Sequence, residues 1–208
     1  MLPWPPRREL APRLARLIPG LIVFGIGIAL MVESDMGLSP WEVLHQGISR
    51  RTGIPIGTVG IIVGFAVLGL WIPLRERIGL GTVLNVAIIG VVLDVTLWLS
   101  PIDELVLWER LAFMVAGVVI IGVGTALYIG AGLGPGPRDG LMTGLGKRGY
   151  RIGVVRTAIE VAVLVLGWLL GGTVGLGTVA FAFGVGPIIG PLLPRLAYTP
   201  PERAREVS

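Results

Sequence analysis

The chain has 208 residues, of which 53% are hydrophobic and only 14% charged. A soluble domain carries about 25% charged residues, so an ordinary soluble fold is excluded, and the long unbroken apolar runs are typical of a chain dissolved in lipid. With no cysteine and one histidine, His45, the chain lacks the residues for disulfides, thiolate metal sites or a two-histidine metal site, and we expect no cofactor or metal. The net charge of +4 does not indicate nucleic acid, because the basic residues flank the apolar runs, where they set membrane orientation.

Six apolar runs each approach the ~20 residues needed to cross a hydrocarbon core. In chain order they lie at 17–33, 57–74, 79–99, 111–131, 152–171 and 174–194. The first run follows basic residues as a secretory signal does, but it is too long and no small-residue cleavage site follows it. The sequence therefore predicts an all-α integral membrane protein, a single membrane domain of six transmembrane helices with polar tails at 1–12 and 195–208.

Basic residues are unevenly divided between the two sides of this arrangement. With the amino terminus inside, 14 of the 17 Lys and Arg residues fall in cytoplasmic segments, and only Arg50, Arg51 and Arg110 fall outside. Because Lys and Arg are enriched in cytoplasmic segments, we expect both tails to be cytoplasmic. The adjacent Arg50 and Arg51 run against this rule.

The chain contains an internal repeat. Residues 13–51 match residues 110–148 at a shift of 97, and beyond a one-residue gap the shift becomes 96. The word Gly-Leu-Gly-Thr-Val at 79–83 then returns unchanged at 175–179. The alignment has 27 identities in 74 positions, which indicates a duplicated unit rather than chance similarity between two glycine-rich sequences.

Each half, 13–99 and 110–194, contains three apolar runs. Because three is odd, the second half must enter the membrane from the opposite side, so the sequence predicts two inverted repeats. Inverted repeats are a hallmark of secondary transporters. Duplication also builds channels and non-transporting bundles, so the repeat alone does not define an activity.

A short helix is expected between the first and second apolar runs of each half, at 39–51 and 136–148. Ser39 can act as N-cap, with Pro40 at the first helical position and Glu42 three residues after the cap, which predicts a capping box. The second copy repeats the arrangement with Gly136, Pro137 and Asp139. A helix of about 12 residues is ~18 Å long, too short to cross a bilayer.

Two placements of these short helices remain open. As re-entrant hairpins they would bring their amino-terminal ends toward the midplane, where irregular backbone is tolerated only beside protein or a cavity. As interfacial helices they would lie flat, with Trp41, Leu44 and Ile48 of the first copy on one face.

Nine polar residues are candidates for function. If the short helices re-enter, those they carry are the best substrate or proton contacts, and His45 in particular titrates near neutral pH; if not, they are headgroup-level charges. These residues are Ser39, Glu42, His45, Arg138 and Asp139. Within the apolar runs lie Asn85, Asp94, Arg156 and Glu160.

The four residues within the apolar runs each have a structural alternative. Asp94 is either a functional intramembrane carboxylate or a cap for a neighbouring helix near the outer interface. Arg156 and Glu160 are four residues apart and can pair on one helix face. Asn85 is expected to hydrogen-bond between helices.

Three sequence words resemble a known family. They are Gly-Leu-Ser-Pro-Trp-Glu-Val-Leu-His-Gln-Gly at 37–47, the later Gly-Leu-Gly-Thr, and Gly-Pro-Arg-Asp-Gly-Leu-Met at 136–142. Over about residues 15–195 the chain resembles the YczE branch of the YczE/YyaS/YitT family. The resemblance implies a multi-pass protein of the bacterial cytoplasmic membrane, and it supplies no functional residues.

The function expected from these features is a small-solute secondary transporter or permease, with the bilayer and a small polar solute as its partners. The alternative is a non-transporting scaffold or regulatory partner of another membrane complex, and both a homo-oligomer and a membrane complex are compatible with the sequence. An enzyme is not expected, because no nucleotide-binding loop, nucleophile–base pair or metal-ligand spacing is present.

Overall fold

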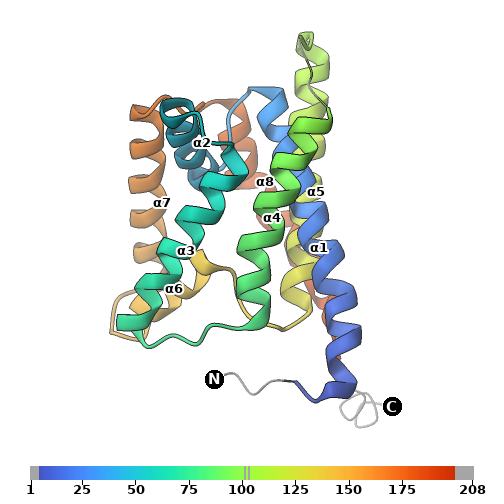
Figure 1. Ribbon diagram of the computed structural model, residues 1–208, viewed down its shortest axis with the longest axis vertical. Coiled ribbons are helices and arrows are strands. Elements are labelled where there is room, and N and C mark those ends of the chain that lie inside the picture. Colours follow the sequence, from blue (N-terminus) through green and yellow to red (C-terminus); the bar gives the residue numbers. More distant parts are fainter. Residues whose placement is uncertain (1–4, 101, 103, 200–208) are drawn as a thin grey trace.

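The computed structural model describes residues 5–100, 102 and 104–199, and over these residues the protein contains helices and no strand (Figure 1). The helices are α1 (Arg7–Ser34), α2 (Pro40–Thr52), α3 (Ile56–Leu74), α4 (Leu80–Leu99), α5 (Leu107–Gly130), α6 (Pro137–Gly146), α7 (Ile152–Leu169) and α8 (Leu176–Leu196). Residues 1–4 and 200–208 of the predicted tails lie outside the described residues. The polar amino-terminal tail was expected to reach residue 12, but α1 already begins at Arg7.

Six of these helices are long and apolar enough to cross a membrane: α1, α3, α4, α5, α7 and α8. Their outer faces carry large exposed apolar side chains such as Phe65, Ile72, Trp98 and Phe183. An apolar surface of this extent requires lipid around it. The prediction of an all-helical chain with six apolar helices is confirmed, and two short helices, α2 and α6, separate the first and second long helices of each half.

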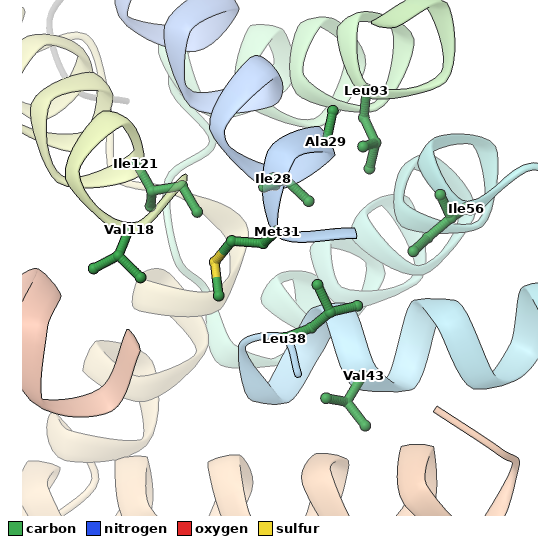
Figure 2. Packing of buried hydrophobic residues seen from close by; sticks show 9 residues of the cluster. All are labelled: Ile28, Ala29, Met31, Leu38, Val43, Ile56, Leu93, Val118 and Ile121. Carbon is green, nitrogen blue, oxygen red and sulfur yellow. The ribbon is translucent and has the colours of Figure 1, made fainter. Parts of the chain in front are cut away.

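α1 and α5 run side by side in opposite directions along one side of the bundle (Figure 1). Glycines allow the close approach: a Cβ atom added at Gly20 would lie 2.8 Å from the backbone nitrogen of Tyr128, and one added at Gly124 would lie 2.7 Å from that of Phe24. Small residues of this kind bring membrane helices together where no hydrophobic force between them exists. Figure 2 shows Met31 of α1 packed among Val118 and Ile121 of α5 within the central apolar cluster.

Two arginines that are paired in the repeat alignment make reciprocal contacts between the halves. Arg13 donates to the carbonyl oxygens of Ala131 and Gly132, at the end of α5. Arg110 donates to the carbonyl oxygens of Ser34 and Asp35, at the end of α1. Each guanidinium therefore satisfies carbonyls that a helix end leaves without a partner.

The repeated Gly-Leu-Gly-Thr words are also used reciprocally. The backbone N–H of Gly81 donates to the carbonyl of Leu133 at 3.0 Å, and that of Gly177 donates to the carbonyl of Met36 at 2.7 Å. The receiving loops contain Gly37 (φ +111°) and Gly134 (φ +129°), in the left-handed region that favours glycine. The start of the last helix of each half is thus joined to the loop before the short helix of the other half.

Each short helix packs against the second long helix of the other half. α2 lies against α7, where the backbones meet so closely that a Cβ atom at Gly167 would be 2.4 Å from the Leu44 nitrogen. α6 lies against α3, where Gly140 sits against the indole ring of Trp71 and Trp71 donates to the Pro137 carbonyl at 3.0 Å. The two short helices lie toward opposite ends of the bundle (Figure 1).

Candidate functional site

The amino-terminal turns of α2 and α6 line one common cavity of about 170 Å³. Its volume suits a small solute rather than a drug-sized ligand. The walls are largely apolar, and the polar groups are concentrated around the two short helices. The polar residues with ionisable or hydrogen-bonding side chains in the lining are Ser39, Trp41, Glu42, His45, Asn85, Tyr128, Arg138, Asp139, Arg156 and Glu160. The structure thus brings together every candidate residue from the sequence except Asp94.

α2 begins where predicted but without the predicted capping box. Ser39 is the N-cap in extended conformation and Pro40 is the first helical residue, yet the Ser39 side chain makes no capping bond. The carboxylate of Glu42 turns to Arg138 of α6 instead. A charge-assisted bond to a guanidinium is stronger than a bond to a backbone N–H, so the capping box was a wrong prediction. In α6 the carboxylate of Asp139 does accept the backbone N–H of Gly136.

The ion pair between Glu42 and Arg138 connects the two halves of the chain. Its N–O distance is 2.5 Å, and the Glu42 side chain is only 5% exposed, against 31% for Arg138. The guanidinium also lies over the Trp41 ring, 5.1 Å from its centroid, in cation–π contact. The ion pair therefore joins the first turn of α2 to the first turn of α6 at the cavity wall.

Three residues of α2 and its N-cap that line this cavity each carry a buried polar atom without a partner. The Ser39 hydroxyl, the Trp41 indole N–H and Nε2 of His45 belong to buried side chains and have no hydrogen bond among the described residues. Buried polar groups are nearly always hydrogen-bonded, because an unmade bond costs about 1–3 kcal/mol. Three such groups therefore lie in residues that border one cavity.

His45 does not titrate near neutral pH. Burial, and to a lesser extent the nearby Arg138 guanidinium, lower the pKa of its imidazole to about 4, while Glu42 opposes the shift. The ring is therefore neutral at physiological pH. The sequence-based idea that His45 couples to protons is corrected by its burial.

Asp139 is the one carboxylate of the cavity without an ion pair among the described residues. A Cβ atom added at Gly136 would lie 3.4 Å from both its Oδ2 atom and the Tyr128 hydroxyl, so these two groups flank the start of α6. Burial raises the pKa of Asp139 above its usual value, and this outweighs the opposing effects of Arg156 and Arg138. Burial thus makes Asp139 easier to protonate than an exposed aspartate.

Arg156 and Glu160 form the expected pair along α7, with Arg156 Nε 3.0 Å from Glu160 Oε1. Both side chains also line the cavity. Asn85 lies on the opposite wall, where its Oδ1 atom is 3.8 Å from the Cβ position of Gly136. It makes no hydrogen bond to another helix within the described part of the chain.

Asp94 is not one of the lining residues but caps α3 just behind the cavity wall, where it binds the lining residue Gly57. Its carboxylate accepts the backbone N–H groups of Gly57 at 2.6 Å and Thr58 at 2.7 Å, and the Thr58 hydroxyl at 2.7 Å. The first N–H groups of a helix have no carbonyl partner within that helix, and the Asp94 carboxylate supplies one for α3. This is the capping role that the sequence offered as the alternative to a functional one.

Replacing Asp94 with alanine is expected to lower the free energy of unfolding by about 1–2 kcal/mol. Thr96→Ala is a matched control on the same helix, because the Thr96 hydroxyl donates only to the Val92 carbonyl of its own helix, and it should change stability by less than ~0.5 kcal/mol. Denaturant unfolding in detergent micelles measures both. An Asp94→Ala protein as stable as the unmodified one would remove the capping role.

Two of the polar cavity residues, Trp41 and Tyr128, were not among the predicted site residues. Tyr128 gives no signal in the sequence, because its partner in the repeat alignment is the apolar Met31. Trp41 was assigned to the apolar face of an interfacial helix, although its ring also carries a donor. Only the relative placement of α2, α5 and α6 brings these groups to the cavity.

Six apolar helices around a small, partly polar cavity define a multi-pass membrane protein. The chain belongs to the family described as "Family of unknown function (DUF6198)", which matches residues 11–193. It is 45% identical over 175 residues to a Haemophilus influenzae protein named "Uncharacterized protein", covering 83% of this chain and 79% of that one.

Two relatives from Bacillus subtilis confirm the resemblance found in the sequence. The chain is 33% identical over 192 residues to "Uncharacterized membrane protein YczE", covering 91% of this chain and 89% of the relative. It is 29% identical over 168 residues to "Uncharacterized protein YyaS", covering 76% and 81%. No solved structure matches the chain.

Proposed function

We propose that the protein is a secondary transporter for a small polar solute, which binds in the cavity between α2 and α6. The observation that carries this proposal is the set of three unpartnered polar atoms, from Ser39, Trp41 and His45, beside the Glu42–Arg138 ion pair. Polar groups are costly within a membrane bundle and are retained there mainly for function. No enzymatic activity is part of this proposal.

The proposal includes two halves related as inverted repeats. Two pairs of equivalent contacts support this relation. Arg13 and Arg110 each bind the helix end of the other half, and Gly81 and Gly177 each bind the loop of the other half. Rocking of two such halves about a fixed site is how many transporters alternate access. Both tails are placed in the cytoplasm on the distribution of basic residues.

The proposal also includes α2 and α6 as re-entrant helices. An interfacial helix exposes its polar face to water, whereas Glu42 and Gln46 of α2 are buried in protein, with the Gln46 side-chain oxygen accepting the Thr173 N–H at 2.7 Å. The two helices direct their amino-terminal turns to one cavity from opposite ends of the bundle. This is the arrangement in which paired helix breaks form a transport site.

The test is uptake by purified protein in liposomes, measured for a broad panel of small metabolites. We expect at least one solute to accumulate. Ser39→Ala, which removes an unpartnered hydroxyl, should leave unfolding unchanged and lower that uptake about tenfold, the effect of losing one ligand hydrogen bond of ~1.4 kcal/mol. Ser49→Ala on the same helix is the control, because Ser49 does not line the cavity and, among the described residues, its hydroxyl donates to the Ile54 carbonyl.

Absence of uptake across the panel by folded protein would contradict the proposal. The alternative function, a scaffold or regulatory partner of a membrane complex, would then be favoured if mild-detergent purification from native membranes retains a stoichiometric partner. A homogeneous lone protein or homo-oligomer in that purification counts against the alternative.

A further inference from the structure

The acidic and basic side chains that line the cavity are unequal in number. Three carboxylates, of Glu42, Asp139 and Glu160, face two guanidiniums, of Arg138 and Arg156. The pairs Glu42–Arg138 and Glu160–Arg156 are formed, which leaves the Asp139 carboxylate over. An uncompensated charge in a low-dielectric site is strongly unfavourable.

We infer that Asp139 binds in alternation a proton and the positive group of a small organic ammonium ion, so that the transported substrate is an organic cation exchanged for a proton. This inference rests on the proposed transport function and names its substrate class. The exchange is balanced in charge: when the ammonium ion binds, the carboxyl O–H bond breaks, and one proton leaves to the side that the cavity faces. Each state of the cavity is then electrically neutral.

The other charged groups around Asp139 are paired with one another. The groups facing Asp139 are Arg156 and Glu160 on α7, Glu42 and His45 on α2, and Tyr128 on α5. His45 stays neutral because burial lowers its pKa to about 4, and the two arginines are held by Glu42 and Glu160. α3 carries no ionisable side chain, and the only one on α4, Asp94, caps α3.

The remaining surroundings favour an ammonium ion over an anion or a divalent metal. An anion would add a second negative charge beside Asp139. A divalent metal would need several acidic or histidine ligands, and the described residues contain no cluster of three. The aromatic rings of Phe24, Trp41 and Tyr128 in the lining are suited to a cation, and the neutral Nε2 of His45 or the Ser39 oxygen can accept an ammonium N–H.

The experiment measures proton release when ammonium ions bind purified protein in weakly buffered detergent solution. The probes are methylammonium, ethanolammonium, tetramethylammonium and choline, with 3,3-dimethylbutan-1-ol as the uncharged analogue of choline and 3,3-dimethylbutyrate as the anionic one. We expect at least one ammonium ion to bind with release of about one proton, and the two analogues to bind at least tenfold more weakly. Because proton and cation compete, affinity should rise with pH up to the raised pKa of Asp139 and then level off.

Asp139→Asn should abolish both the proton release and the pH dependence, and Asp139→Glu should restore them in part. Asparagine keeps an acceptor for the Gly136 N–H, so the variant is expected to fold, which its unfolding curve checks. Glu76→Gln is the control, since Glu76 pairs with Lys147 outside the cavity. Ammonium binding without proton release, equal binding to Asp139→Asn, or no binding of any ammonium ion would overturn the inference.

The outcomes separate the inference from the transport function. Uptake of a neutral or anionic solute that survives Asp139→Asn would refute the ammonium inference and leave the transporter standing. Proton-linked ammonium binding in a protein that moves no solute would refute transport and leave the binding site standing.

Discussion

Arg138→Gln is expected to lower the free energy of unfolding by about 3–5 kcal/mol, because it leaves the buried carboxylate of Glu42 without its partner. Glu42 is 5% exposed and bonds to Arg138 at 2.5 Å. The reverse change, Glu42→Gln, should lower the free energy of unfolding by less, ~3 kcal/mol. The Arg138 guanidinium that it leaves unpaired is 31% exposed and keeps its contact with the Trp41 ring. Reversible unfolding in mixed micelles measures both.

The double variant, Glu42→Gln with Arg138→Gln, decides whether the pair acts as a unit. A fully removed buried pair leaves no uncompensated charge, so the double variant should be more stable than Arg138→Gln alone. The contact between Arg50 and Asp35 is the control, because both side chains are about half exposed, and Arg50→Gln should lower the free energy of unfolding by no more than ~1 kcal/mol. Additive losses in the Glu42–Arg138 cycle would mean that the two short helices are not coupled through this ion pair.

The long helices could be predicted from the sequence because lipid imposes a simple length rule. A span needs about 20 apolar residues whatever its neighbours are, so runs such as 111–131 and 152–171 closely match α5 and α7. The short helices were also accessible, since Pro40 and Pro137 mark their first residues. α1 extends back to Arg7. Its first residues are polar, so hydropathy alone does not predict that they are helical.

Most polar residues of the candidate site could be predicted from the sequence, but not which of them form pairs. Ser39, Glu42, Arg138 and Asp139 were recognisable because the repeat places them in equivalent loops. That Glu42 binds Arg138 rather than the backbone at Ser39 depends on how the halves face each other. No one-dimensional pattern contains that information, and Tyr128 was missed for the same reason.

The two copies of the short helix share the residues that turn and pack them. Identical positions are Gly37 with Gly134, Pro40 with Pro137, and Gly47 with Gly144. At the cavity, Glu42 and Asp139 are both acidic, whereas Ser39, Trp41 and His45 of α2 stand against Gly136, Arg138 and Met142 of α6. The two sides of the cavity are therefore chemically different, although the frame that carries them is repeated.

Single cysteines at Ile54 and Tyr150 are expected to react with a membrane-impermeant maleimide from opposite sides of the membrane. The two residues are equivalent in the repeat and partly or fully exposed, and each follows a short helix. The protein has no native cysteine, so each variant carries one reactive thiol. Ile54→Cys should be labelled in intact cells, and Tyr150→Cys only in inverted vesicles, because an odd number of crossings in each half reverses the second copy.

Two further cysteines calibrate the labelling. Ile78→Cys, between α3 and α4, should react from the cytoplasmic side, and Val106→Cys, before α5, from the outer side; both residues are exposed. Labelling of Ile54→Cys and Tyr150→Cys from the same side, with the two controls as expected, would place the halves in parallel. Reciprocal contacts such as those of Arg13 and Arg110 join the end of α5 to the start of α1 and the end of α1 to the start of α5. Parallel halves cannot form both of these contacts. Labelling of the two cysteines from the same side would therefore contradict the inverted topology and, with it, the alternating-access mechanism.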